Sequence, residues 1–227
     1  MISPIIVALD LERDLALDLA KSLDPNNCRL KVGSQLFTSV GPRVIEELSA
    51  LGFDVFLDLK FHDIPNTVAQ SVKAASNLGV WMLNVHTSGG STMIKAAKEA
   101  TTGLVDPPLI IGVTMLTSLS KKDVNEIGIQ DISNQALSLA SLAKKNSLDG
   151  IVCSANDVRR IKELLGKDFI TVTPGIRSSN SSKDDQSRVS SARNAIEKGA
   201  DYLVIGRPIT KSTNPMESLD SIIKEIS

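Results

Sequence analysis

Short apolar runs rich in β-branched residues alternate with longer, helix-like segments along the whole chain. Eight such runs lie at residues 5–10, 29–33, 54–60, 82–86, 109–115, 150–154, 170–174 and 202–206. Their length and composition predict strands buried on both faces. Apolar positions spaced by 3.6 residues predict helices in the intervening segments, among them 11–23, 41–51, 66–78, 134–145, 186–198 and 216–226.

Strands that alternate with helices indicate parallel pairing through right-handed crossovers. Eight such units in 227 residues predict a compact (β/α)8 TIM barrel that forms a single domain over residues 1–227. The alternative is an open, doubly wound sheet, but no G-x-G-x-x-G follows the first strand. No linker interrupts the pattern. Residues 178–185 are polar and long for a loop between a strand and a helix.

Charged and polar residues gather where the predicted strands end, the face on which this fold carries its active sites. Alternation along a strand places Asp58 and Lys60 on one face, and the same argument turns Lys31, Asn84 and His86 toward the barrel mouth. The leucines and valines between them would then pack on helices. The alternative is that interior salt bridges merely fill the barrel, although an apolar filling would be simpler and no less stable.

A phosphate site is predicted after the seventh and eighth strands, where barrels often bind phosphate. The chain reads TPGIR at 173–177 and IGRP at 205–208. Glycine lets backbone N–H groups approach an anion, and Arg177 and Arg207 each offer a planar fork of donors. Two turn glycines followed by two surface arginines are the simpler alternative.

Composition narrows the possible partners. Hydrophobic residues are 42% of the chain and aromatic residues 3%, which predicts an aliphatic core, and a net charge of −1 makes a nucleic-acid polymer an improbable partner. No apolar run is long enough to span a bilayer and no signal peptide is evident. Cys28 and Cys153 lack metal-ligand spacing and suggest buried thiols in a reducing compartment, so a cytoplasmic location is expected.

The segment LDLKFHDIPNT at 57–67 resembles the signature of the orotidine 5′-phosphate decarboxylase family, most of all its bacterial branch. The resemblance extends in the family's order through VALD at 7–10, LKVG at 30–33, NVH at 84–86 and LTS at 116–118, and then through TPGIR and IGRP. By itself, the spacing Asp-x-Lys-x-x-Asp at 58–63 is weak. The long signature is specific, and no family site position departs from the pattern.

The resemblance implies decarboxylation of orotidine 5′-monophosphate to UMP, the last step of de novo UMP biosynthesis, without a metal or cofactor. Lys60 matches the residue that protonates C6, and Lys31, Asp58 and Asp63 match the rest of a Lys-Asp-Lys-Asp array. The family forms homodimers in which Asp63 and Thr67 cross the interface. The other implied substrate-binding residues are Asp10 at the ribose, Thr117 and Ser118 beside the pyrimidine, and the phosphate set Arg177, Gln186, Gly206 and Arg207, with Ile64 and Pro174 also in the substrate-binding set.

Three other functions fit parts of the pattern. A sugar-phosphate decarboxylase of the same superfamily, such as one acting on 3-keto-gulonate 6-phosphate, shares Asp-x-Lys-x-x-Asp but uses magnesium. An aldolase would form a Schiff base on Lys60 or Lys31. A non-enzymatic sensor would bind a phosphorylated ligand without turnover. Survival of activity in a chelator, borohydride trapping, and binding without turnover would separate these functions from one another.

Overall fold

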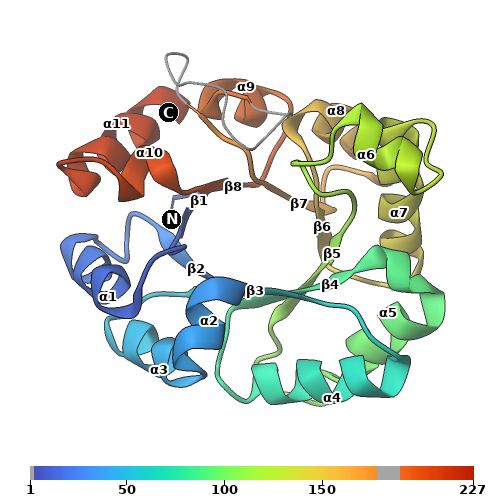
Figure 1. Ribbon diagram of the computed structural model, residues 1–227, viewed down its shortest axis with the longest axis horizontal. Helices are drawn as coiled ribbons and strands as arrows, with labels where there is room; N and C mark the ends of the chain where they lie inside the picture. Colours follow the sequence, from blue (N-terminus) through green and yellow to red (C-terminus); the bar gives the residue numbers. More distant parts are fainter. Residues whose placement is uncertain (1–2, 178–189) are drawn as a thin grey trace.

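The computed structural model describes residues 3–177 and 190–227 and shows a closed parallel barrel (Figure 1). The strands follow the chain order around the barrel, and β8 pairs with β1. They are β1 Ile5–Ala8, β2 Arg29–Gly33, β3 Val55–Phe61, β4 Met82–His86, β5 Leu109–Val113, β6 Gly150–Val152, β7 Ile170–Thr173 and β8 Tyr202–Ile205. The TIM-barrel prediction is confirmed, and the open sheet is excluded because the barrel closes.

The helices surround the strands as an outer ring (Figure 1). They are α1 Arg13–Ser22, α2 Ser34–Val40, α3 Arg43–Ala50, α4 Pro65–Ser76, α5 Gly90–Glu99, α6 Lys121–Glu126, α7 Ile132–Lys145, α8 Ala155–Leu165, α9 Ala192–Glu197, α10 Arg207–Thr210 and α11 Pro215–Ile226, with a 3-10 turn, η1, at Thr87–Gly89. The predicted helix 186–198 begins outside the described residues, and its described part is α9.

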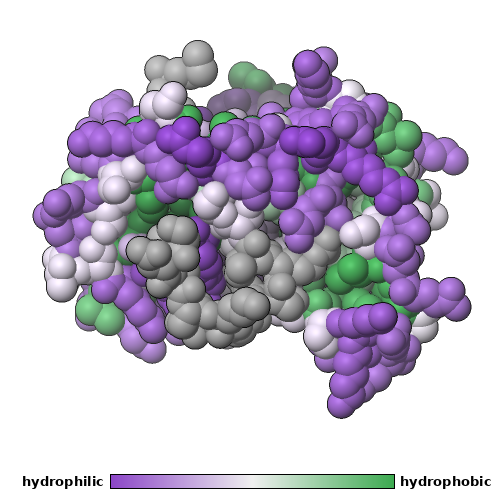
Figure 2. Space-filling view, turned by 90° about the horizontal axis from the view of Figure 1, so that it is seen from above, coloured by the Kyte–Doolittle hydropathy of each residue, from purple (hydrophilic) through white to green (hydrophobic). Residues whose placement is uncertain are grey.

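Two hydrophobic layers hold the barrel together. Ile6, Phe56, Met82, Ile111 and Val172 belong to the cluster inside the barrel. The larger cluster lies between the strands and the helices. Each fully buried aliphatic side chain contributes about 1.5–3 kcal/mol relative to leaving it exposed. The outer surface in Figure 2 is mainly hydrophilic, with small separate apolar patches. Within the described ranges, no helix is long and apolar enough to cross a membrane.

The predicted outward direction of the aliphatic residues beside the charged ones is confirmed. Leu30 and Val32 of β2, Leu57 of β3, and Leu83 and Val85 of β4 all belong to the outer hydrophobic layer. Their polar neighbours on the same strands therefore project toward the barrel axis. This alternation carries charged side chains to the end of the barrel where the strands finish.

Candidate active site

A cavity of about 580 Å³ opens at the carboxyl ends of the strands, within the size range of small-molecule sites. Its wall combines residues from β1, β2 and β3 with residues that follow β5, β7 and β8. The predicted site residues that line the cavity are Asp10, Lys31, Asp58, Lys60, Thr117, Pro174, Arg177, Gly206 and Arg207. The fold therefore brings the family-like motifs of both halves of the chain to one place.

Four charged side chains form a continuous chain along one wall. The Lys31 Nζ atom lies 2.9 Å from Asp10 Oδ1 and 3.3 Å from Asp58 Oδ2, and the Lys60 Nζ atom lies 2.7 Å from Asp58 Oδ1. Lys31 and Asp58 are buried, whereas the Asp10 and Lys60 side chains are 57% and 34% exposed. Asp10 and Lys60, at the two ends of this row of charges, are thus accessible to a ligand, whereas Lys31 and Asp58 at its centre are held in place.

Burial and charge oppose each other at the centre of this chain. Burial favours the neutral form of Asp58, but the Lys31 and Lys60 ammonium groups outweigh it and lower the pKa of Asp58 below its ordinary value. Burial likewise disfavours the charged form of Lys31, yet Asp58 and Asp10 raise the pKa of Lys31 above its ordinary value. Both groups are therefore ionised at neutral pH, in a place where ions are costly unless they are paired.

The backbone of β3 is irregular where it carries this chemistry. Leu57 pairs with Leu83 and Phe61 pairs with Val85, so four residue steps along β3 face two along β4. Within this bulge Lys60 has a φ of 55°, a left-handed conformation that is uncommon for a lysine. Asp58 and Lys60 both line the cavity, as predicted, although the strand between them does not alternate regularly.

Gly33, the last residue of β2, lies beside the charge chain. A Cβ atom built on Gly33 would lie 2.9 Å from Asp10 Oδ1 and 3.0 Å from Lys31 Nζ. Contacts this short would force one of the two charged groups to move. The glycine at this position therefore leaves room for the Asp10–Lys31 ion pair, a requirement that sequence reasoning did not identify.

Two histidines lie beside the lysines. The rings of His62 and His86 are 5.3 Å apart between centroids, and His86 is half-buried whereas His62 is exposed. Burial lowers the pKa of His86, and His62 and Lys60 lower it further. His86 is therefore neutral at neutral pH, consistent with a supporting position next to Lys60.

The opposite part of the wall carries the predicted phosphate residues. Gly175 follows β7 with a φ of 81°, and the Arg177 Nη1 atom donates to the Ile176 carbonyl oxygen at 2.7 Å. Gly206 precedes α10, which begins at Arg207. Lys211, which sequence reasoning missed, also lines the cavity. It lies four residues after Arg207, a spacing that places side chains on one helix face and could have revealed it.

Five predicted site residues are not among those that line the cavity. Asp63, Ile64, Thr67 and Ser118 are exposed and do not line the cavity of a single chain. The Asp63 carboxylate accepts a hydrogen bond from the Ile64 N–H at 2.6 Å, and Thr67 lies in the first turn of α4. Gln186 lies outside the described residues. The assignments of all five stay predictions.

A closed barrel with a charged cavity at the carboxyl ends of its strands is the architecture of a TIM-barrel enzyme. The model of the orotidine 5′-phosphate decarboxylase / HUMPS family matches residues 3–222, so the chain belongs to this family. Proteins called orotidine 5′-phosphate decarboxylase are similar to it over nearly their full lengths. The one from Legionella pneumophila strain Corby is 52% identical, covering 100% of both chains, and that from Saccharophagus degradans is 50% identical, covering 98% of this chain and 94% of the relative.

Solved structures agree with this assignment. The crystal structure of orotidine 5′-phosphate decarboxylase from Lactobacillus acidophilus superimposes with a TM-score of 0.86 at 40% identity, and the match covers 99% of each chain. The corresponding enzyme from Pyrococcus horikoshii OT3 superimposes with a TM-score of 0.80 at 26% identity, covering 98% of each chain. The family resemblance and the barrel fold are thus confirmed together.

Proposed function

We propose that the protein decarboxylates orotidine 5′-monophosphate to UMP and CO2, the last step of de novo UMP biosynthesis. The observation that carries the proposal is the chain Asp10–Lys31–Asp58–Lys60, which faces a cavity whose other wall holds Arg177 and Arg207. The names of the relatives support the same substrate. We further propose that the enzyme works in the cytoplasm without a metal or cofactor.

The chemistry requires a cation that also carries a proton. When CO2 leaves C6 of the pyrimidine, the bonding electron pair stays in an sp2 orbital with little delocalisation. An ammonium group beside C6 stabilises that charge and then transfers a proton to C6. Lys60 fits this role because its Nζ atom is held 2.7 Å from Asp58 and its side chain reaches the open part of the cavity. Two charges about 4 Å apart interact by about 4 kcal/mol at an effective dielectric of 20.

The remaining residues would bind and orient the nucleotide. Asp10 is exposed enough to accept a ribose hydroxyl group while it keeps Lys31 in place. Thr117 and Ser118 would contact the pyrimidine, and Ile64 and Pro174 would contribute to substrate binding. Arg177, Gln186, Gly206 and Arg207 would hold the phosphate, in the strand 7 and 8 region that many barrels use for this purpose. Binding energy from the phosphate can then fix the pyrimidine ring against Lys60.

We propose that two copies of the chain complete each other's sites. Asp63 and Thr67 are exposed beyond the end of β3, and Ile64 between them is 67% exposed. Pro65 occupies the first turn of α4 and restricts the backbone that carries these residues. In a two-fold dimer this segment would enter the partner's cavity, so that Asp63 becomes the fourth charge of the array. The alternative is that Asp63 serves only its own loop.

Absorbance-monitored turnover of orotidine 5′-monophosphate by protein treated with a chelator tests the reaction. Formation of UMP at an undiminished rate supports the proposal and excludes the magnesium-dependent sugar-phosphate decarboxylase. Borohydride added with substrate tests the Schiff-base aldolase, because only an imine is trapped as a stable adduct. If the nucleotide binds but no UMP forms under any condition, the phosphate-ligand sensor is favoured and the proposed reaction is wrong.

A subunit-mixing experiment tests the shared site. Lys60→Ala and Asp63→Ala homodimers should each be nearly inactive. A mixed dimer would contain one doubly altered site and one intact site, so re-equilibrated mixtures should recover up to about a quarter of wild-type activity. Subunit exchange is verified with two differently tagged chains. If the subunits exchange but no activity returns, Asp63 acts within its own chain.

A further inference from the structure

The side chain of Asn84 connects the two parts of β3 that carry Asp58 and Lys60. Asn84 lies on β4 and is fully buried. Its Nδ2 atom donates to Asp58 Oδ1 at 2.7 Å, and its Oδ1 atom accepts from the Lys60 backbone N–H at 2.7 Å. One amide group therefore holds both the carboxylate and the backbone of the lysine that pairs with it.

The β3 bulge explains why such a connection is needed. Because four steps of β3 face two steps of β4, the regular strand ladder does not continue through Lys60. A buried N–H without a partner is destabilising, and the left-handed backbone of Lys60 adds strain. The Asn84 amide supplies the partner that the ladder lacks, and the same amide fixes Asp58, on which the Lys60 ammonium rests at 2.7 Å.

We propose that Asn84 is a positioning residue for the reaction, holding the Lys60 backbone in its left-handed conformation and orienting Asp58 so that the Lys60 ammonium points into the cavity. This inference rests on the proposed function, because Lys60 is taken as the proton donor. The alternative is a purely structural role, in which Asn84 only satisfies buried polar groups and stabilises the fold. The two ideas differ in what a change at Asn84 does to turnover relative to stability.

Two substitutions separate the two hydrogen bonds. Asn84→Leu keeps the branched shape of the side chain, is larger, and removes both hydrogen bonds. Asn84→Asp keeps an acceptor for the Lys60 N–H but replaces the donor to Asp58 with a second carboxyl group. Thr114→Val is the matched control: Thr114 is buried, its hydroxyl donates to the Val152 carbonyl oxygen at 2.8 Å, and it does not line the cavity. Asn84→Ala repeats the test without added bulk if Asn84→Leu does not fold.

Amide hydrogen exchange at Lys60 tests the geometry without any reaction. We expect exchange at this position to accelerate about fivefold or more in Asn84→Leu, as expected for loss of a hydrogen bond worth about 1 kcal/mol. It should stay near the wild-type rate in Asn84→Asp and Thr114→Val. Unchanged protection of the Lys60 amide in Asn84→Leu would overturn the proposed backbone role.

Steady-state kinetics test the positioning role. We expect Asn84→Leu to lower kcat about 100-fold, the scale of a misplacement of about 1 Å, with a much smaller change in KM. Thr114→Val should lose stability but keep its kcat. If Asn84→Leu or Asn84→Ala folds and its kcat stays within threefold of wild type, Asn84 is structural only. If wild-type protein does not convert the nucleotide, the proposed function fails instead, and the exchange data still decide the geometry.

The pH profile of Asn84→Asp provides a further check. Two adjacent carboxyl groups share a proton more readily as the pH falls, and a protonated carboxyl group can donate to Asp58 as the amide does. The kcat of Asn84→Asp relative to wild type should therefore rise as the pH is lowered, while the ratio for Asn84→Leu stays constant. Parallel profiles for both variants would contradict the proposed orientation of Asp58 by Asn84.

Discussion

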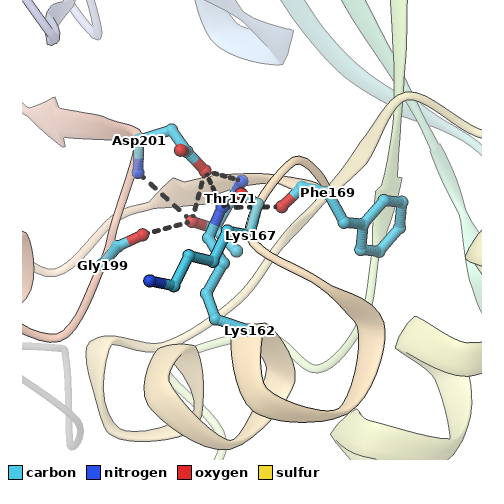
Figure 3. Close-up of polar contacts among 6 residues, drawn as sticks. All are labelled: Lys162, Lys167, Phe169, Thr171, Gly199 and Asp201. Carbon is cyan, nitrogen blue, oxygen red and sulfur yellow. Dashed lines mark hydrogen bonds and ion pairs between the residues drawn. The ribbon is translucent and has the colours of Figure 1, made fainter.

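The two ends of the barrel both contain lysine–aspartate pairs that are at least partly shielded from solvent, but the hydrogen bonds of these pairs are completed in different ways. At the amino end of β7 and β8, the Lys162 ammonium donates to Asp201 Oδ2 at 2.6 Å and to the carbonyl oxygens of Lys167 and Phe169 at 2.7 and 2.9 Å (Figure 3). The same Asp201 oxygen accepts from the Thr171 N–H and hydroxyl groups at 2.6 and 2.9 Å. All three ammonium protons thus have acceptors within the chain.

At the carboxyl end, the lysines are paired with carboxylates, and Asp58 also accepts a hydrogen bond from the Asn84 amide. Lys31 lies between Asp10 and Asp58, Lys60 contacts Asp58, and these side chains face a cavity rather than backbone carbonyls. At the amino end, the Lys162 ammonium connects α8 to the start of β7 through backbone carbonyl oxygens and to the start of β8 through the Asp201 carboxylate, an arrangement that serves stability. Side chains that face a cavity keep charge available for a ligand, at a cost in stability that active sites commonly carry. The predictions below test this division of roles, starting with the largest expected effect.

Removing Lys60, at the carboxyl end of the barrel, should affect turnover far more than stability. Lys60→Ala is expected to lower kcat about 10²–10⁴-fold, the usual contribution of a general acid, while the nucleotide still binds. Turnover and product binding are measured on the same preparation. A variant that keeps more than about a tenth of wild-type activity would remove Lys60 from the role of proton donor.

The phosphate wall should contribute less than Lys60 and act mainly on substrate capture. Arg207→Ala is expected to lower kcat/KM about 10–100-fold, the scale of a lost charge-assisted hydrogen bond, and Gln186→Ala should act in the same direction. The nucleoside orotidine should be a far poorer substrate than its phosphate. Equal turnover of nucleoside and nucleotide would show that Arg207 and Gln186 do not form a phosphate site.

A methyl group added at Gly33 tests how closely the charge chain is packed. Because the new Cβ would meet Asp10 Oδ1 and Lys31 Nζ at about 3 Å, Gly33→Ala should shift the ion pair and lower kcat/KM about tenfold. Ala16→Gly, in the buried face of α1, is a control that alters packing away from the cavity. If Gly33→Ala and Ala16→Gly behave alike, the close approach does not matter for function.

The lysine at the amino end should show the opposite behaviour. Lys162→Met is expected to destabilise the fold by about 2 kcal/mol, since it removes the ammonium donor from two carbonyl oxygens and the ion pair from Asp201, which keeps only its hydrogen bonds from Thr171. For a chain of this size that corresponds to a fall in Tm of about 4–8 °C. Its kcat at a temperature where it is folded should equal that of wild type. A large loss of turnover in fully folded Lys162→Met would break the comparison between the two ends.

Sequence patterns predict most of this architecture because parallel strands buried on both faces are continuous apolar runs. Alternation was enough to turn Lys31, Asp58 and Asn84 inward. The predicted helix 41–51 begins two residues later, at Arg43, because Gly41 has a positive φ and ends the preceding helix Ser34–Val40. The left-handed backbone of Lys60 was missed, since it depends on Asn84, which lies 24 residues away along the chain.

Other parts of the site are not contained in one chain's local pattern. Gly33 appears in the sequence as an ordinary glycine at the end of a strand, and only the folded positions of Asp10 and Lys31 explain it. Asp63 and Thr67 lie outside the cavity of a single chain, and the family resemblance alone assigned them to a neighbouring subunit. The sequence thus predicted which charged residues form the site, whereas the distances between them could be obtained only from the folded barrel.

The smallest expected effect is a pH dependence of stability from the charge chain. The folded-state pKa of Asp58 lies below its ordinary value near 3.8, so its ionisation stabilises the fold above that pH, and this contribution is lost as the pH falls through the folded value. The folded-state pKa of Lys31 lies above its ordinary value of 10.5, so its contribution is present below pH 10.5 and is lost as the pH rises through the folded value.

Chemical denaturation of wild type and Asp58→Asn at several pH values measures the acid side of this window. The absolute difference in unfolding free energy is not the test, because replacing a buried charge at an active site by a neutral group can itself stabilise a protein. The test is the trend. The difference, wild type minus variant, should be constant between about pH 5 and 8 and should fall as the pH drops below about 4. Lys162→Met serves as the comparison at the other end of the barrel, because it leaves Asp58 and its partners in place. If the difference for Asp58→Asn does not change between about pH 3 and 7, the paired lysines do not hold Asp58 in its ionised form, and the charge chain is not organised as the distances indicate.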